Sequence, residues 1–320
     1  MTKYLLLFSG FCVLILSSQS CAQENRTIAF YNVENLFDTL DTPNKDDAEF
    51  LPKSNRQWNS LRYNEKIAHI NEVVEHMNKP LILGLCEIEN ESVVRDIINF
   101  SKLKDTYGIV HTESNDMRGI DNAIIYDSTV LTLVSDGVIR FDMPEGSRPT
   151  RDIIWGKFVS GKDSILTMIN HWPSRSGGQA KSEPKRLIAA IAAKTYIDSV
   201  LQASPTMQIV FMGDLNDHPD NRAPQMISDV LKPMITANSG EFGGTHNYRG
   251  EWGILDHIFI SSNFMKKKGI HVAKKSGKIY SPDFILSTYK GNIVPFRTYG
   301  GGNYLKGYSD HLPVSISIDL

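Results

Sequence analysis

The feature that most constrains this fold is a set of five short polar motifs, each at the end of an apolar, β-rich run or at the turn beside it. In α/β folds the functional side chains usually lie at such positions. The motifs extend from residue 31 to residue 313. Because a site drawn from both ends of a chain requires both ends to fold together, we predict one domain, residues 25–320. The motifs are Tyr31-Asn32-Val33-Glu34-Asn35, Glu87, Asn170-His171-Trp172, Gly213-Asp214-Leu215-Asn216-Asp217 and Ser309-Asp310-His311-Leu312-Pro313.

Strands and helices are mixed along the chain. Ile67, Ile70 and Val74 recur at helical spacing, and they predict a helix over 61–77 that ends before Pro80. Further helices are predicted at 91–103 and at about 183–202, the latter with Ser182 as its N-cap. Apolar, β-branched and aromatic residues predict strands at 27–33, 81–86, 121–126, 130–141, 153–159, 165–170, 207–212, 254–261 and 314–318.

Composition is that of an ordinary globular protein. The chain has 320 residues, of which 41% are hydrophobic, so it can bury a sizeable core. Its formal net charge of -2 does not resemble that of a strongly basic nucleic-acid binder. Of its three cysteines, Cys12 and Cys21 fall in the N-terminal segment, which leaves Cys86 without a partner for an intramolecular disulfide. We interpret Cys86 as a small buried hydrophobic residue and not as a nucleophile.

The first 22 residues have the pattern of an export signal. Lys3 is followed by an apolar run, 4–16, which is shorter than the about 20 residues that span a bilayer. Ser20 and Ala22 fit ordinary signal peptidase cleavage, whereas Cys21 fits the lipidated cysteine of a lipoprotein, although Ser18 stands where leucine is usual. We therefore expect an exported protein, periplasmic, extracellular or anchored to the outer membrane through Cys21, with no transmembrane helix in the mature chain.

The motif residues suit the hydrolysis of a phosphodiester. That reaction requires charge neutralisation at the phosphate, a positioned water and stabilisation of the leaving oxygen. Magnesium prefers oxygen ligands, so Glu87, with Asn32 and Asp310, is a candidate metal site; Mn²⁺ and Ca²⁺ are alternatives. Zinc sites usually combine several His or Cys residues at characteristic spacing, which this chain lacks.

The remaining motif residues supply the proton transfers. Asp214 and Asn216, two residues apart around a tight turn, could hold and deprotonate the attacking water. His171 and His311 could stabilise the transition state, with His171 the favoured proton donor to the leaving oxygen. A structural role is the alternative for each residue, because isolated Asn and Asp at strand ends are more often turn or cap residues.

These residues, in this order, resemble the endonuclease/exonuclease/phosphatase superfamily, which includes deoxyribonuclease I, abasic-site endonucleases, bacterial sphingomyelinases and inositol polyphosphate 5-phosphatases. The resemblance implies a deoxyribonuclease I-like, four-layered α/β sandwich with two packed mixed β-sheets and outer helices. It also implies that Asn32 and Glu87 belong to the metal site, with Glu87 the main ligand. Asp214 and Asn216 match the family's Gly-Asp-x-Asn turn, which activates water.

The resemblance assigns roles to four more residues. His171 matches the histidine that the deoxyribonuclease and sphingomyelinase branches use near the leaving group. Asp256 matches the aspartate that orients the last histidine, here His311, and Asp310 matches a metal-proximal aspartate. Asp121 stands where a carboxylate could orient His171. Glu34 stands near the position where some nucleases carry an aspartate.

Loops beside the motifs are candidates for substrate binding. Residues 173–183 follow His171 and residues 297–308 precede Asp310, and both stretches combine glycine with basic and aromatic or polar residues. Solvated loops are the alternative interpretation. A basic run at 266–278 is typical of solvated surface, with contact to a polyanion as the alternative. The substrate-binding candidates are Arg118, Asp121, Arg151, Asn170, Arg175, Arg297 and Tyr304.

Histidines outside the motifs are interpreted as structural. His257 directly follows Asp256, so strand alternation should turn it to the opposite face of the sheet. His111 and His218, among others, show no partner pattern.

Function is predicted as that of an exported, monomeric, Mg²⁺-dependent endonuclease or other nuclease. The alternative within enzymes is a phosphatase or a phospholipase C or sphingomyelinase-type phosphodiesterase. The alternative of another class is a non-catalytic surface binding lipoprotein. All the expected catalytic positions are filled, which favours an enzyme.

Overall fold

The computed structural model describes residues 26–320. The predicted signal peptide, residues 1–22, lies outside these residues, as do Cys12 and Cys21. Within the described part, no helix has the length and apolarity needed to cross a membrane. Cys86 is free and fully buried, in agreement with its interpretation as a core residue.

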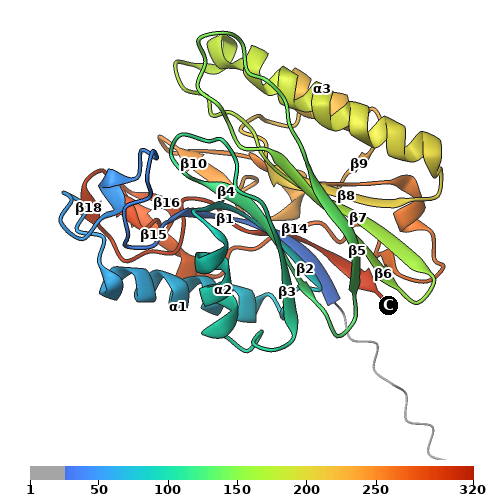
Figure 1. The fold of residues 1–320 in the computed structure, drawn as a ribbon, viewed down its shortest axis with the longest axis horizontal. Helices are drawn as coiled ribbons and strands as arrows, with labels where there is room; N and C mark the ends of the chain where they lie inside the picture. Colours follow the sequence, from blue (N-terminus) through green and yellow to red (C-terminus); the bar gives the residue numbers. More distant parts are fainter. Residues whose placement is uncertain (1–25) are drawn as a thin grey trace, which may run out of the picture.

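Two large β-sheets form the centre of the molecule, and helices cover their outer faces (Figure 1). This arrangement confirms the predicted four-layered α/β sandwich. In the first sheet the strand order is β13-β19-β1-β2-β4-β3, with β14 also paired to β19. Only β1 and β2 run parallel among its pairs. Its strands are β1 (Arg26–Leu36), β2 (Ile82–Ile88), β3 (Tyr107–His111), β4 (Asp121–Asp127), β13 (His271–Val272), β14 (Lys278–Ile279) and β19 (Val314–Asp319).

The second sheet has the order β5-β6-β7-β8-β12-β9, with β7 and β8 parallel and the other pairs antiparallel. Its strands are β5 (Thr132–Ile139), β6 (Ile153–Ser160), β7 (Asp163–His171), β8 (Gln208–Asp214), β9 (Lys232–Pro233) and β12 (Asp256–Ile260). Three two-stranded pairs flank the sheets: β10 (His246–Tyr248) with β11 (Glu251–Gly253), β15 (Leu286–Tyr289) with β16 (Asn292–Pro295), and β17 (Tyr299–Gly300) with β18 (Asn303–Tyr304).

The helices lie where the apolar periodicity predicts them. The asparagines at 59 and 90 cap α1 and α2 through their side chains, as expected for helix N-caps. The long helix begins at Gln179, three residues before the predicted Ser182 cap, and Ser182 lies in its first turn, where its hydroxyl donates to Gly178 O. The sequence analysis missed strand β3 and helix α4. The helices are α1 (Ser60–His76), α2 (Glu91–Asn99), α3 (Gln179–Ala203) and α4 (Arg222–Ser228), with single-turn 3-10 helices at Ala48–Phe50, Ala237–Ser239, Ser262–Met265 and Asp283–Ile285.

Strand β8 shows why its sequence is apolar almost throughout. Val210 and Met212 face the core between the two sheets, whereas Ile209 and Phe211 face the layer beneath α3 and α4. A strand covered on both faces needs apolar residues at both sets of positions. In the first sheet Gly84 faces Ile169 of the second, and a Cβ at Gly84 would lie 2.4 Å from Ile169 Cδ1, so the sheets approach closely there.

A buried ion pair joins α3 to the turn after β8. Arg186 Nε lies 2.8 Å from Asp217 Oδ2, and both side chains are fully buried. Gln179 and Ser182, in the first turn of α3, complete the polar shell of Arg186. The pair therefore fixes the turn that carries Asp214 and Asn216 against the start of α3.

We predict that Arg186→Met will lower the free energy of unfolding by about 3–5 kcal/mol, because it leaves the buried Asp217 carboxylate uncompensated. The double variant Arg186→Met/Asp217→Leu should recover part of this loss. Urea denaturation at fixed pH measures both values. Arg95→Met, which removes a surface ion pair with Glu91, is the control and should change stability by no more than about 0.5 kcal/mol. A loss no larger than that of the control would contradict the prediction.

Candidate active site

Three neighbouring strands of the second sheet align the first group of polar side chains. His171 of β7 is the register partner of Asp214 in β8, and Asp214 is the partner of Asp256 in β12. Directly opposite residues point to the same face, so all three side chains face the space between the sheets. Gly213 lies so close to Asn170 that a Cβ would be 2.1 Å from Asn170 O. Only glycine fits at this position of the motif.

The first sheet contributes Glu87 through an irregularity in β2. The core-facing residues of β2 include Cys86, so regular alternation would turn Glu87 away from the core. Instead the register shifts between Cys86 and Ile88, and Glu87 has a left-handed φ of 62°. Such bulges redirect side chains. Glu87 Oε1 consequently lies 3.8 Å from His171 Nε2, and Asn35 N donates to Glu87 Oε2 at 2.9 Å.

Asn32 connects the two sheets at the site. Its Nδ2 donates to Asp214 Oδ2 at 3.1 Å, and its Oδ1 accepts from Glu34 N at 3.0 Å. Ser309 Oγ donates to Asn32 O, and His311 N in turn donates to Ser309 Oγ. Asn32 therefore orients Asp214 and attaches the Ser309-Asp310-His311 motif to β1, while its predicted role as a metal ligand stays a prediction.

His311 is paired with Asp256. His311 Nδ1 lies 2.7 Å from Asp256 Oδ2, and Nε2 lies 3.8 Å from Asp214 Oδ2. Burial by itself lowers the pKa of His311, but the carboxylates of Asp256 and Asp214 outweigh it and hold this pKa well above its ordinary value. The two carboxylates therefore favour the cationic ring, and the contact with Asp256 Oδ2 fixes its orientation, as the family resemblance implies.

Asp214 and His171 have pKa shifts in opposite directions. Burial raises the pKa of Asp214 to about 7, with a further contribution from Asp256, while the cationic His311 opposes the shift. Burial, with the nearby Arg151 and Arg118, lowers the pKa of His171 well below its ordinary value. Its Nδ1 has no hydrogen-bond partner among the described residues. These shifts favour a neutral ring at His171 and a cationic ring at His311.

Asp310 belongs to a network of charged side chains beside the cleft, in which Glu34 and Lys66 are buried and Arg297 is exposed. Arg297 donates to Asp310 Oδ2 at 2.8 Å and lies 3.4 Å from Glu34 Oε1. Thr298 N also donates to Glu34 Oε2, and Lys66 Nζ donates to Thr298 Oγ1 and to the carbonyl of Tyr308. Burial raises the pKa of Glu34 and lowers that of Lys66. Glu34 thus holds the loop before Asp310 in place and is occupied by these contacts.

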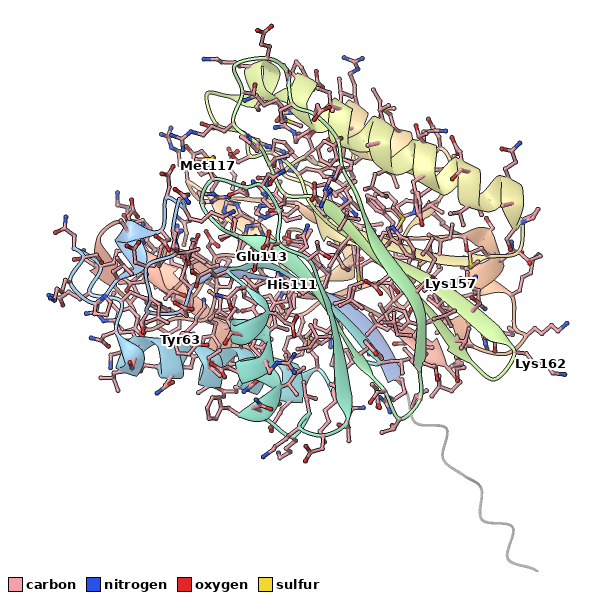
Figure 2. All side chains as sticks on the ribbon, viewed as in Figure 1. Tyr63, His111, Glu113, Met117, Lys157 and Lys162 are labelled. Carbon is pink, nitrogen blue, oxygen red and sulfur yellow. The ribbon has the colours of Figure 1, made fainter. Side chains whose placement is uncertain are left out.

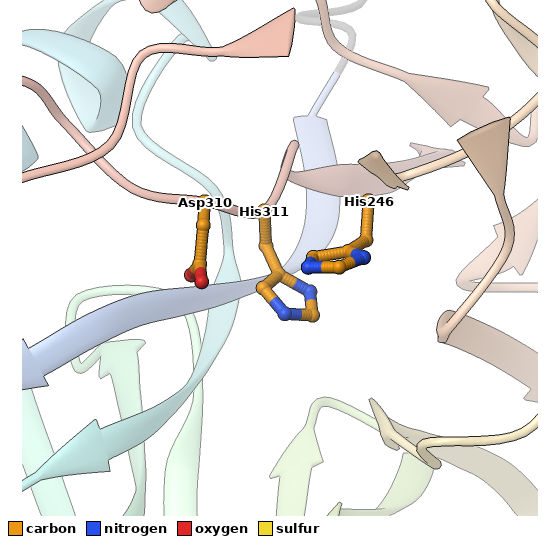
Figure 3. A group of neighbouring side chains, drawn as sticks. All are labelled: His246, Asp310 and His311. Atoms are coloured by element: carbon orange, nitrogen blue, oxygen red, sulfur yellow. The ribbon is translucent and has the colours of Figure 1, made fainter. Parts of the chain in front are cut away.

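A cleft of about 710 Å³ opens over these residues. Its floor includes Glu87, Asp214, Asp310 and His311. The rings of His246 and His311 contact each other in a tilted arrangement with centroids 4.8 Å apart, and Figure 3 shows His311 between Asp310 and His246. The sequence analysis missed His246, since it follows the glycine pair 243–244 with no motif of its own. The loop 173–183, predicted to bind substrate, contributes Ser174, Gly177, Gly178 and Gln179 to the lining. The other lining residues that the sequence analysis missed are His218, Tyr248, Glu251, Trp252, Gly253 and Leu255.

Of the predicted substrate-binding residues, Arg118 and Arg175 line this cleft. Arg175 also donates from Nε to Asn216 O at 2.8 Å. Asn170 is fully buried and accepts from the Trp172 indole, so it supports the motif from within the core. Arg151 is buried and donates to Asp116 and to Trp172 O. These two residues position the site from behind.

Two expectations need correction. Tyr304 lines no part of the cleft, because its hydroxyl donates to Glu65 of α1 at 2.6 Å. Asp121 does not orient His171: it lies 3.4 Å from His111 Nε2 and accepts from Ser114 N. His111, which showed no partner pattern in the sequence, therefore has one. Both errors arise from contacts between segments whose pairing local sequence does not encode.

The residues of the cleft fit a hard divalent cation. Asp214, Asp256 and His311 place ligand atoms within 4.8 Å of one another, and His246, Asp310 and His311 do the same. Asn35 N donates to Glu87 Oε2, and the Glu87 side chain lines the cleft. Carboxylate oxygens in this number match the preference of Mg²⁺ and Ca²⁺. The assignment of Glu87 and Asp310 as ligands and the choice of metal both stay predictions.

Comparisons with known proteins show the family of the chain and agree with its fold. A model of the Endonuclease/Exonuclease/phosphatase family matches residues 27–320. No curated protein matches the sequence. A mannosyl-6-phosphatase of Bacteroides thetaiotaomicron is similar in structure, with a TM-score of 0.58 and 16% identity over 92% of this chain and 100% of that chain. The catalytic domain of human Nocturnin gives 0.56 and 15% over 92% and 94%. Truncated TDP2 of Caenorhabditis elegans gives 0.55 and 17% over 93% and 98%.

We predict that Asp256→Asn will lower the pKa of His311 markedly, because it removes the carboxylate that most strongly favours the cationic ring. The fraction of charged His311 at pH 7 should fall accordingly. An NMR titration of the metal-free protein that follows the histidine ring signals measures this change. Asp319→Asn, which alters the partner of His271 at the surface, is the matched control. An unchanged His311 titration in Asp256→Asn would contradict the assignment.

Proposed function

Since the chain belongs to the endonuclease/exonuclease/phosphatase family, whose members hydrolyse phosphoester bonds, we propose that it is a Mg²⁺-dependent phosphodiesterase that cleaves nucleic acid. The observation that carries this choice of substrate is a second, basic hollow that continues the cleft. Arg118, Ser174 and Gly177 line both hollows. A substrate held at Glu87 therefore has a basic surface beside it.

We call this second hollow of about 560 Å³ the basic groove. Its charged lining residues are Asp116, Arg118, Arg148, Arg151, Lys181 and Lys185. Arg151 neutralises Asp116 at 3.0 Å, and Arg148 pairs with Asp46. Lys181 and Lys185, on the first turns of α3, take part in no ion pair within residues 26–320. Because the net charge of the chain is -2, this concentration of basic side chains is local and suits a substrate with further phosphates.

In the proposed reaction Asp214 accepts the proton of the attacking water. Its raised pKa of about 7 suits a base that works near neutral pH. Asn216 N donates to Asp214 Oδ1 at 2.9 Å, and Asn32 donates to Oδ2, so the carboxylate is held in one orientation. A bound Mg²⁺ would neutralise phosphate charge, with Glu87 and Asp310 as its protein ligands.

The proton donor is better assigned to His311 than to His171. Sequence reasoning favoured His171, but burial and two arginines keep its ring neutral. His311 carries charge and is oriented by Asp256, so it has a proton to give. His171, 3.7 Å from Asp214 Oδ2 and 3.8 Å from Glu87 Oε1, is suited to donating a hydrogen bond to the phosphate.

A second candidate is a phosphatase or a phospholipase C-type hydrolase that acts on one phosphorylated sugar or lipid headgroup. The observation in its favour is the aromatic wall of the cleft, formed by His246, Tyr248 and Trp252. Aromatic faces pack against sugar rings as well as against bases. This candidate leaves Lys181 and Lys185 without a role, which is why we prefer the nuclease.

We also propose that the protein works outside the cytoplasm. The support is the sequence pattern of residues 1–22, with either cleavage before residue 23 or a lipid anchor at Cys21. We propose that it acts as a monomer. Mass spectrometry of the N-terminus of the native protein distinguishes the lipidated from the unmodified form.

We predict that alanine at Glu87, Asp214 or His311 will each lower kcat on nucleic acid by roughly 10²–10⁴-fold, as removal of a general acid, a general base or a metal ligand usually does. EDTA should abolish cleavage and Mg²⁺ should restore it, with Mn²⁺ and Ca²⁺ compared in parallel. Circular dichroism checks that the variants fold, and Glu145→Ala on an exposed loop is the control. Near-wild-type turnover in any of the three would refute the role of that residue.

We predict that Lys181→Gln/Lys185→Gln will lower kcat/KM on single-stranded oligonucleotides about tenfold at low salt and will flatten the salt dependence. Hydrolysis of bis(4-nitrophenyl) phosphate, which has one phosphate, should stay within about twofold. Lys267→Gln/Lys268→Gln removes the same charge near the far end of α3, where Asn263 contacts Pro205. Equal losses on both substrates, or activity only on mannose 6-phosphate or sphingomyelin, would favour the second candidate.

A further inference from the structure

A second group of metal-binding side chains lies on the β3–β4 hairpin. His111, the last residue of β3, pairs with Ala123 of β4. Glu113 lies in the loop just beyond β3, and Asp121 is the first residue of β4. His111, Glu113 and Asp121 place one ligand atom each within 4.8 Å of one another. Figure 2 labels His111 and Glu113 beside this hairpin.

Two buried atoms of this group face each other without a hydrogen bond. The side chains of His111 and Asp121 are 4% and 2% exposed, and His111 Nε2 lies 3.4 Å from Asp121 Oδ2. Neither atom has a hydrogen-bond partner within residues 26–320. Asp121 Oδ1, by contrast, accepts from Ser114 N at 2.9 Å. Buried polar atoms are nearly always satisfied, so an additional partner is expected at this point.

The charges at this cluster favour an additional cation. Two carboxylates close together each disfavour the ionised form of the other. Partial burial and the Asp121 carboxylate raise the pKa of Glu113, and Lys45 and His111 offset only part of this shift. Lys45 Nζ donates to the carbonyls of Ser114 and Asp116. Within residues 26–320 it forms no ion pair with Glu113 or Asp121.

We propose that His111, Glu113 and Asp121 form a second divalent-cation site, separate from the catalytic cleft, that prefers Zn²⁺ or Mn²⁺. One imidazole and two carboxylates suit these ions, whereas Mg²⁺ and Ca²⁺ favour oxygen ligands alone. None of the three residues lines the cleft. Glu113 is exposed, so the ion can enter from solvent and water can complete its coordination.

The proposed ion would connect the two ends of the loop between β3 and β4. Residues 112–120 connect His111 to Asp121, and this loop carries Arg118 into the cleft and Asp116 to Arg151. A metal ion bound at both ends of this loop would reduce the number of conformations that the loop can adopt. The site is therefore a structural one, and it stands whether or not the proposed nuclease activity is correct.

Metal binding by the full mature chain tests the proposal. In the variant Glu87→Gln/Asp310→Asn, which weakens the catalytic site, we expect about one equivalent of Zn²⁺ by calorimetry and a rise in melting temperature with Zn²⁺. Adding Glu113→Gln should weaken Zn²⁺ binding at least about tenfold and remove the rise in melting temperature, because one charged ligand is lost. Glu145→Gln in the same background is the matched control.

Two results would overturn the site. One is that the wild type binds Zn²⁺ or Mn²⁺ and Glu87→Gln/Asp310→Asn binds neither. The catalytic cleft would then account for all of the metal binding. The other is unchanged affinity after Glu113→Gln. Glu113 is exposed, so this variant should fold even where His111→Ala does not. Loss of nuclease activity plays no part in either outcome, so failure of the proposed function is distinguished from failure of this site.

Discussion

The register of β7, β8 and β12 is the constraint on which the site depends. Hydrogen bonding across these strands places His171, Asp214 and Asp256 in one row on the inner face of their sheet. A shift of any one strand by a single residue would turn its side chain into the layer beneath α3. The apolar alternation of β8, with Val210 and Met212 on one face, is what prevents such a shift. Core packing therefore determines active-site geometry.

Several acidic side chains lie close together where the two sheets meet. Neighbouring basic side chains compensate their negative charge. Asp214 and Asp256 share the cationic His311, while Arg297 and Lys66 balance Asp310 and Glu34. Burying carboxylates is costly unless each has a counter-charge or hydrogen bonds. The carboxylates of Asp214, Asp256 and Asp310 therefore have cationic partners in His311 and Arg297. Glu87 has a backbone hydrogen bond from Asn35 and lines the cleft.

Sequence reasoning located most strands, the principal helices and the residues that meet in the cleft, because each motif ends an apolar run of clear periodicity. It did not foresee how Glu87 reaches the inner face, since alternation alone directs it outward and only the shift beside Ile88 reverses it. It missed His246 and the His111–Asp121 contact for a related reason. His246 reaches the site through a bridge to His311 from a distant part of the chain, and the His111–Asp121 contact depends on the register of the β3–β4 hairpin. Neither leaves a periodic signal in the chain.

Several residues around the cleft adopt a backbone conformation that normally belongs to glycine. Glu34, Asn35, Glu87 and Asn216 all have φ near 50–62°. A side chain in this region costs free energy that glycine would not. Substitution by glycine would relieve this backbone strain but would remove the functional side chain. Thermal stability and catalytic activity therefore make opposite demands at these positions. Selection for thermal robustness alone would be expected to erode this part of the molecule first.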